Sequence, residues 1–409
     1  NFLKGLKAYF DKHAWKNTEL SDLLKELSIS SGRDLDSWTK LWLQSSGATL
    51  LRPVIKTDDK NVITSAIINQ EPPSAPPGLP PVLRPHRLAV GTYEKQGNKL
   101  VRSNRFEIDV EGAVTEVKEL IGLTRPALIL VNDDDLTYAK IRLDEVSLDT
   151  ATKEIASIDS SLSRALIWGA VWDMVRDGEV GTGKYLDLVL SGLEAETDIG
   201  LVQQVLMQCR SAIDVYADRK NRISYNTKFA DGIENLLAQA ENGSDRQLAL
   251  VRTFSAVATT EAQINSYLTT SKTLDDIEGI YESSSYKLGV TRIKENTFYA
   301  TVISSTNENW KPGEVKLIIK KDGGLYKGTF FDGNKEEKTD HTVNLVNNIL
   351  DFDIVLYDKT FPAPKIKQDI KEYEIMKDEQ APKLSFPKND LAVFTFPNNQ
   401  QSRSIKWLN

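Results

Sequence analysis

The sequence has few of the side chains that most often build catalytic centres. Its 409 residues include a single cysteine, Cys209, which excludes an intrachain disulfide and a cysteine-based zinc cluster. The three histidines, His13, His86 and His341, lie far apart along the chain, and no His-Glu-x-x-His pair is present. That pair places two imidazoles on one helical face for zinc, so no zinc motif can be recognised. We expect each histidine to be a surface or packing residue.

Long apolar runs and an excess of positive charge are also missing. The longest apolar stretches, such as Pro126–Val131, are far shorter than the ~20 residues needed to cross a bilayer. The net charge of -7 argues against a nucleic-acid partner, because binding phosphates requires a basic surface. We therefore expect no membrane span and no nucleic-acid partner. A balance of 40% hydrophobic and 27% charged residues excludes wholesale disorder, and the length predicts roughly two to four domains.

Composition changes near residue 280. Residues 1–280 hold 17 Lys and 15 Arg, whereas residues 281–409 hold 17 Lys and 2 Arg. Alanine is common before this point and scarce after it. Two interpretations stay open: a lysine-rich surface domain on one protein, or two stretches of different origin.

Residues 1–52 have the periodicity of amphipathic helices. A first stripe at i, i+3, i+4 and i+7 begins at Leu20, and Gly32 is expected to follow the end of that helix. A second helix capped by Asp34 places leucines and two tryptophans on one side. Large apolar side chains at helical spacing are most often buried, so we expect a core there. The residues concerned are Leu20, Leu23, Leu24, Leu27, Leu35, Trp38, Leu41 and Trp42.

Residues 53–144 are predicted to form a β-sandwich. Alternation of apolar and polar residues indicates strands over residues 86–93, 105–110 and 138–143, and residues 126–131 are typical of a buried strand. The proline-rich stretch of residues 71–81 favours extended backbone and is expected to be a long loop.

Residues 145–280 are predicted to be helices in succession, as in an α-solenoid or a bundle of helix pairs. One apolar stripe contains Cys209, which we expect to be an inert small hydrophobe rather than a nucleophile. The stripes are Ile199, Val202, Leu206, Cys209, Ile213 and Tyr216, then Phe229, Ile233, Leu236 and Leu237, and then Leu248, Leu250, Val251 and Phe254.

After Gly279 the apolar period becomes two. Alternation at residues 286–290, 298–302 and 315–319, with turn residues between them, predicts a small β-barrel or sandwich over residues 281–409. Residues 359–388, rich in Lys and Pro, are expected to be a linker or loop. The fold class is therefore α+β multidomain.

Two short motifs could suggest ligand binding. Gly178–Lys184 is similar to a phosphate-binding loop, but Tyr185 replaces the hydroxyl residue that would hold magnesium, and the segment follows a predicted helix rather than a strand. We expect a turn between helices. Asp133–Asp135 lacks the glycine and distal glutamate of a calcium loop, so we expect a solvated turn with Asn132.

Several segments of residues 1–280 resemble one family of enzymes. Their combination resembles the part of an aminopeptidase N-type zinc metallopeptidase that follows its zinc site, most of all in its bacterial, actinobacterial-type branch. The segments are Gly5–Tyr9, Asn17–Asp22, Ser31–Leu35 with Trp38 and Trp42, Leu51–Pro53, Arg84–Arg87, Val131–Tyr138 and Arg164–Glu179.

This resemblance implies an architecture and a missing site. Residues 1–52 then correspond to the closing helices of the thermolysin-like catalytic domain, residues 53–144 to its β-sandwich, and residues 145–280 to the helical domain that caps the active site. The zinc-binding helix, the Gly-x-Met-Glu-Asn motif and the transition-state tyrosine of the family all precede this region. The resemblance therefore implies zinc and peptide substrates for the full-length family, but it assigns no catalytic, metal-binding or substrate-binding residue here.

Residues 275–409 resemble a different family. Ile277–Tyr281, Tyr286–Val290 and Asn309–Val315 are similar to the leading β-domain of C-terminal-processing (tail-specific) serine peptidases. Their Ser/Lys catalytic domain would come later in such a protein. Because the two resemblances meet near Leu274–Ile277, we expect a join of two gene fragments, and the start at Asn1 is expected to reflect a fragment.

The sequence thus favours the non-catalytic C-terminal region of a zinc aminopeptidase, in the cytoplasm, whose helical domain closes over a peptide and selects it. This polypeptide alone is expected to be inactive. Two alternatives stay open: a binding or scaffold protein that uses the surface of the helical region, and an accessory region of a tail-specific serine peptidase.

Overall fold

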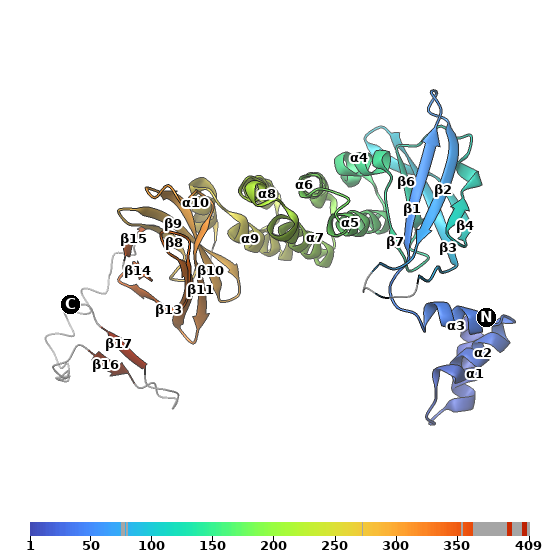
Figure 1. Ribbon diagram of the computed structural model, residues 1–409, viewed down its shortest axis with the longest axis horizontal. Coiled ribbons are helices and arrows are strands. Elements are labelled where there is room, and N and C mark those ends of the chain that lie inside the picture. The colour runs from blue at the N-terminus through green and yellow to red at the C-terminus, as the bar shows by residue number, and fades with distance from the viewer. Residues whose placement is uncertain are drawn as a thin grey trace.

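The computed structural model describes residues 1–74, 78, 81–271, 273–352 and 355–362, and the backbone of two paired strands, β16 (Leu391–Phe394) and β17 (Arg403–Lys406). From the N-terminus the chain forms a small helical unit, two β-sheets, a row of helices and a β-barrel, in an elongated arrangement (Figure 1). The expectation of mixed helices and sheets is therefore confirmed. Within the described residues, no helix combines the length and the apolar character needed to cross a membrane.

The N-terminal unit consists of α1 (Phe2–His13), α2 (Leu20–Ser31) and α3 (Asp36–Trp42). A capping box starts α2, and Gly32 ends it at a φ of 69°. The expected core is only partly formed, because Leu20 and Trp38 are 48% and 42% exposed. The helical spacing was correct, but the prediction that both side chains are buried was wrong, since no described residue covers them fully.

Two sheets follow and share one hydrophobic core. In the four-stranded sheet, β1 (Leu50–Thr57) lies between β2 (Ile63–Glu71) and the parallel strand β7 (Lys140–Ile141), and β5 (Val114–Glu116) is at the edge. The other sheet places β3 (His86–Gln96) between β4 (Lys99–Val110) and β6 (Leu128–Asp133). The proline-rich stretch of residues 71–81 lies partly outside the described residues, at 75–77 and 79–80.

Six of the helices that the structure describes, α4–α9, then stack in two layers. The contacts run from α4 (Glu145–Glu154) to α6 (Thr182–Gly192) and α8 (Arg222–Gln239) in one layer. In the other layer they run from α5 (Ser161–Arg176) to α7 (Ile199–Ser211) and α9 (Asp245–Val257) (Figure 1). The last helix is α10 (Glu261–Thr270). Contacts between every second helix are typical of stacked helix pairs, so we refer to α4–α10 as the helical array.

The expected apolar stripes mostly face the inside of the array. Cys209 is buried in α7 with its stripe neighbours, and burial raises the pKa of its thiol, which fits an inert packing role. Tyr216 and Leu248 are exceptions, at 44% and 47% exposed. The prediction that they are buried was wrong because Tyr216 lies at the end of a π-helical turn that follows α7, and Leu248 lies on the outer side of α9.

The remaining strands form a closed barrel of eight strands. Residues of the expected alternation, such as Leu288, Val290, Phe298 and Ala300, fill its interior. The last strand pairs with the first and closes the barrel, so Lys359–Phe361 belong to a strand and not to the expected linker. The rest of that expected linker, from residue 363, lies outside the described residues. The strands are β8 (Gly279–Glu282), β9 (Tyr286–Lys294), β10 (Thr297–Ser305), β11 (Val315–Asp322), β12 (Leu325–Phe331), β13 (Glu337–Val346), β14 (Ile349–Asp351) and β15 (Leu356–Phe361).

The barrel packs directly on the end of the helical array. Ile280 and Ile303 of the barrel belong to the same buried cluster as the helices, and Gly289 of β9 lies against Ile264 of α10. Glu278, which is 0% exposed, accepts hydrogen bonds from the Tyr267 hydroxyl (2.5 Å) and from the backbone N–H of Asp275 (2.8 Å). We call these contacts the array–barrel junction.

Candidate functional site

The histidines do not assemble into a site. His86 is buried between Thr49 and Thr137, whose hydroxyls lie 2.9 and 2.7 Å from its two ring nitrogens. Burial, assisted by the charge of Arg84, lowers the pKa of His86 to about 4, so the imidazole is neutral at pH 7. His13 lies at the end of α1, and His341 packs edge-on against a phenylalanine ring in the barrel. His86 is thus a packing residue, as the sequence predicted.

Zinc does not fit the side chains that the structure describes. Among those residues, no group of three or more His, Cys, Asp and Glu side chains could hold a metal ion. Structural and catalytic zinc sites both need at least three such protein ligands in proximity. No chemical step can therefore be assigned to a metal held by these residues.

Asp133, the first of three consecutive aspartates, links the sheets to the helical array. Asp133 is 0% exposed and accepts hydrogen bonds from the hydroxyls of Tyr93 and Ser163, each at 2.9 Å. The expected solvated turn was wrong for Asp133 and Asn132, which are both buried. A Cβ on Gly91 would come within 2.0 Å of the Asp133 carboxylate, so only glycine leaves room for it.

Buried arginines make two further links between the sheets and the first helices. Arg142, with a fully buried side chain, pairs with Asp177 and with Glu179, the latter at 3.0 Å. A hydrogen bond from Arg52 lowers the pKa of Glu179 against the effect of burial. Within the array, Arg164 pairs with the buried Glu196 at 2.8 Å. Several segments that carry the aminopeptidase resemblance thus contribute structural ion pairs.

The loop similar to a phosphate-binding loop is a turn between helices, as expected. It lies between α5 and α6, and α6 begins within it at Thr182. Lys184, which would reach a phosphate, forms an ion pair with Asp149 of α4. The strand that a phosphate-binding loop requires is therefore replaced by a helix.

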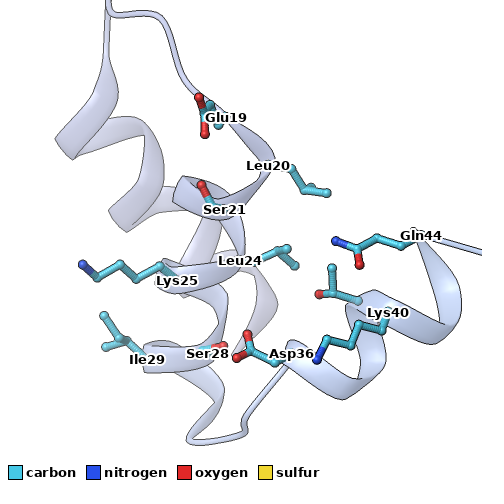
Figure 2. A pocket seen from close by; sticks show the side chains of 11 residues that line it. Glu19, Leu20, Ser21, Leu24, Lys25, Ser28, Ile29, Asp36, Lys40 and Gln44 are labelled. Atoms are coloured by element: carbon cyan, nitrogen blue, oxygen red, sulfur yellow. The ribbon is translucent and has the colours of Figure 1, made fainter.

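A hollow of about 700 Å³ lies between α2 and α3. Figure 2 shows Leu20 and Leu24 of α2 pointing toward Gln44, which follows the end of α3. Lys25, Lys40 and Asp36 surround this apolar centre. An open hollow with an apolar centre and a charged rim is typical of a surface that packs on another protein region. The sequence analysis missed it because the same leucines were expected to be buried.

Comparison with known proteins agrees with this architecture. Residues 128–310 match the family described as the ERAP1-like C-terminal domain. This match begins in β6, covers the helical array, and continues through β8 to β10 of the barrel.

Three relatives are named aminopeptidases. "Aminopeptidase N" of Streptomyces lividans is 50% identical over 267 residues, which are 64% of this chain and 31% of the relative. "Aminopeptidase N" of Lactococcus lactis subsp. lactis is 42% identical over 57 residues, or 14% of this chain and 7% of the relative. "Aminopeptidase 2" of Candida albicans is 36% identical over 58 residues, or 14% of this chain and 6% of the relative. The chain thus spans less than a third of the length of these relatives, and it resembles the C-terminal part of aminopeptidase N.

Proposed function

We propose that this chain is the non-catalytic C-terminal region of a zinc-dependent aminopeptidase that releases N-terminal residues from peptides in the cytoplasm. The observation that carries the proposal is the 50% identity with Aminopeptidase N of Streptomyces lividans over 267 residues. Residues 1–52 then complete a thermolysin-like catalytic domain, residues 53–144 form its β-sandwich domain, and residues 145–280 form the domain that covers the active site. Residues 281–409 add a β-domain of different origin, joined to the aminopeptidase part near residue 280.

The exposed apolar side chains of α1–α3 support this assignment. Phe2, Phe10 and Trp15 are largely exposed, as is Trp38. Burying a large apolar side chain stabilises a protein by about 1.5–3 kcal/mol, so a cluster of such side chains in water indicates a surface that normally packs on another region. In the proposed enzyme, that region is the part of the catalytic domain that holds zinc.

The helical array suits the role of a rigid cover. Its first helices are fixed to the sheets through Asp133 and Arg142, so the array and the sheets move together. A cover of this kind closes the cavity over a bound peptide, excludes water from the reaction and limits the length of peptide that enters.

A fusion protein tests the proposal. The part of Streptomyces lividans Aminopeptidase N that precedes the matched region is joined to residues 1–409, and release of p-nitroaniline from leucine p-nitroanilide is measured with and without a zinc chelator. We expect zinc-dependent activity from the fusion and none from either part alone. Zinc-dependent activity of residues 1–409 alone would overturn the non-catalytic assignment.

A second fusion that ends at residue 144 tests the role of the array. We expect it to lose discrimination between short and long peptides, measured as the ratio of their kcat/KM values. An unchanged ratio would contradict selection by the array.

The two-layer stacking also favours one alternative, a binding or scaffold protein that uses the extended surface of the array. Saturable binding of a partner by the whole chain, but not by residues 1–144, would favour that alternative. The resemblance of residues 275–409 to tail-specific serine peptidases stays a prediction.

A further inference from the structure

Two hollows meet where the helical array touches the barrel. One, of about 380 Å³, lies between α7 and α9, and the other, of about 460 Å³, lies between α9 and the end of β9. Arg252 and Ile293 line both, so the two hollows adjoin, and we call them together the junction groove.

The junction groove carries an excess of positive charge. Arg210, Arg252, Arg292 and Lys294 line it, whereas its acidic residues are Asp214 and Glu295. This local excess stands out in a chain with a net charge of -7. The groove therefore has a positive electrostatic potential, which attracts anions.

Most of these cations lack a bound partner. Within the described part of the chain, the side chains of Arg210, Arg252 and Lys294 form no hydrogen bond or ion pair, although the charge of Arg210 acts on the nearby Asp214, where it opposes the rise in pKa that burial causes. Elsewhere in the molecule, Arg142 and Arg164 are both paired with carboxylates. Unpaired guanidinium groups in a hollow keep their donors available for a carboxylate, which they bind through two parallel hydrogen bonds.

Arg292 differs from the other three because it is held in place. Its guanidinium pairs with the buried Glu278 at 3.2 Å and lies over the ring of Phe298, with 5.3 Å to the ring centroid. It therefore fixes the floor of the groove at the junction, while Arg210, Arg252 and Lys294 provide the charge available for binding.

The groove also has apolar walls. Leu206, Met207 and Ala249 contribute from the helices, and Ile293 contributes from the barrel. Methionine adapts its shape to different side chains, and Met207 is 62% exposed. A short extended peptide in which acidic and apolar residues alternate would place carboxylates on the basic residues of the groove and apolar side chains against its apolar walls.

We propose that the junction groove binds an acidic peptide segment, with its carboxylates on Arg210, Arg252 and Lys294 and its apolar side chains against Met207 and Ile293. A long polyanion such as duplex DNA fits less well, because the net negative charge of the chain repels it beyond the groove. Binding requires only this chain, so it is independent of the proposed aminopeptidase activity.

Fluorescence anisotropy tests the proposal with the full chain and a labelled peptide, Asp-Leu-Glu-Ala-Glu-Leu. We expect saturable binding that weakens at least tenfold for the double variant Arg210→Glu and Arg252→Glu. The matched control, Lys16→Glu with Arg33→Glu, makes the same change in net charge in the distant helical unit and should alter the affinity less than twofold. Because Arg210 is half-buried, the exposed Lys294→Glu serves as a second groove variant, and we expect it to weaken binding at least threefold.

Three results would overturn the proposal. The first is an affinity for the acidic peptide that falls equally in the groove variants and in the control, or that falls in neither groove variant. The second is equal binding of the peptide Asn-Leu-Gln-Ala-Gln-Leu, which lacks the carboxylates. The third is complete displacement of the acidic peptide by duplex DNA at an equal concentration of charge, which would show a general anion surface instead.

Discussion

The N-terminal helices and the C-terminal barrel are attached to the rest of the chain in opposite ways. Helices α1–α3 bury only Gly5, Glu26 and Thr39, and several of their large apolar side chains, such as Phe2 and Phe10, are exposed. The barrel has a core of its own and also shares the core of the helical array through Ile280 and Ile303. One end of the molecule leaves apolar surface uncovered, whereas the other end covers it.

The contacts at the two ends differ in kind as well. Helix α3 is attached mainly by polar contacts, in which the Arg84 guanidinium donates to the carbonyl oxygens of Leu41 and Gly47, each at 2.7 Å. The array–barrel junction combines apolar packing with the buried carboxylate of Glu278. Exposed apolar side chains on α1–α3 and a shared core between the array and the barrel are the contrast that the proposed aminopeptidase assignment predicts.

The largest expected effect comes from removing the buried carboxylate of the junction. Glu278→Ala leaves Arg292 and the Tyr267 hydroxyl without their partner, and because Arg292 is 34% exposed the cost should be about 3 kcal/mol, the lower end of the range for breaking a buried ion pair. We expect that loss in the free energy of unfolding from urea titration. Glu282→Ala, which removes only a partly exposed ion pair with Lys287, should cost less than about 1 kcal/mol. If the two variants lose the same free energy of unfolding, the buried carboxylate of Glu278 does not stabilise the array–barrel junction.

A smaller effect is expected from adding one methyl group at the same junction. A Cβ on Gly289 would lie 2.5 Å from the Cδ1 atom of Ile264, so Gly289→Ala should cost about 1–3 kcal/mol through overpacking. The double variant with Ile264→Val removes that Cδ1 atom and should recover part of the loss. Gly333→Ala is the control, because its Cβ meets no atom closer than 3.4 Å. No recovery in the double variant would argue against close packing between barrel and array.

At the other end, acid should weaken the attachment of α3. The pKa of His86 is about 4 in the folded protein, whereas an unperturbed histidine, as in the unfolded chain, has a pKa of 6.5. Between these two pH values the unfolded chain therefore binds more protons than the folded protein. Stability therefore falls as the pH falls through this window, by about 2 kcal/mol between pH 7 and pH 5. The Trp42 ring packs edge-on against His86, so α3 should be affected.

Urea unfolding at both pH values measures this loss. His86→Gln cannot titrate and should remove the pH-dependent part, while the exposed His341→Gln in the barrel should keep it. If His86→Gln leaves the difference between pH 7 and pH 5 intact, another group causes it.

The sequence predicted local features well and long-range partners poorly. The alternation at Leu288 and Val290 and the helical stripe around Cys209 reflect periods that each element sets by itself. Asp133 was assigned to solvent because its partners, Tyr93 and Ser163, are 40 and 30 residues away in the chain. The junction groove was missed for the same reason, since two helices and a strand supply its cations.

The smallest effect in this chain is expected at the most exposed aromatic side chains of the N-terminal unit. Phe10 and Trp15 are 62% and 103% exposed, so Phe10→Gln with Trp15→Gln should change the free energy of unfolding of residues 1–409 by less than about 0.5 kcal/mol. In the fusion with the preceding part of the Streptomyces lividans relative, the same pair should cost about 2 kcal/mol or more, because the side chains are then buried. Urea titration of both proteins, with and without the substitutions, gives the comparison. Equal effects in the two proteins would mean that the uncovered surface of α1–α3 is not where the preceding region packs.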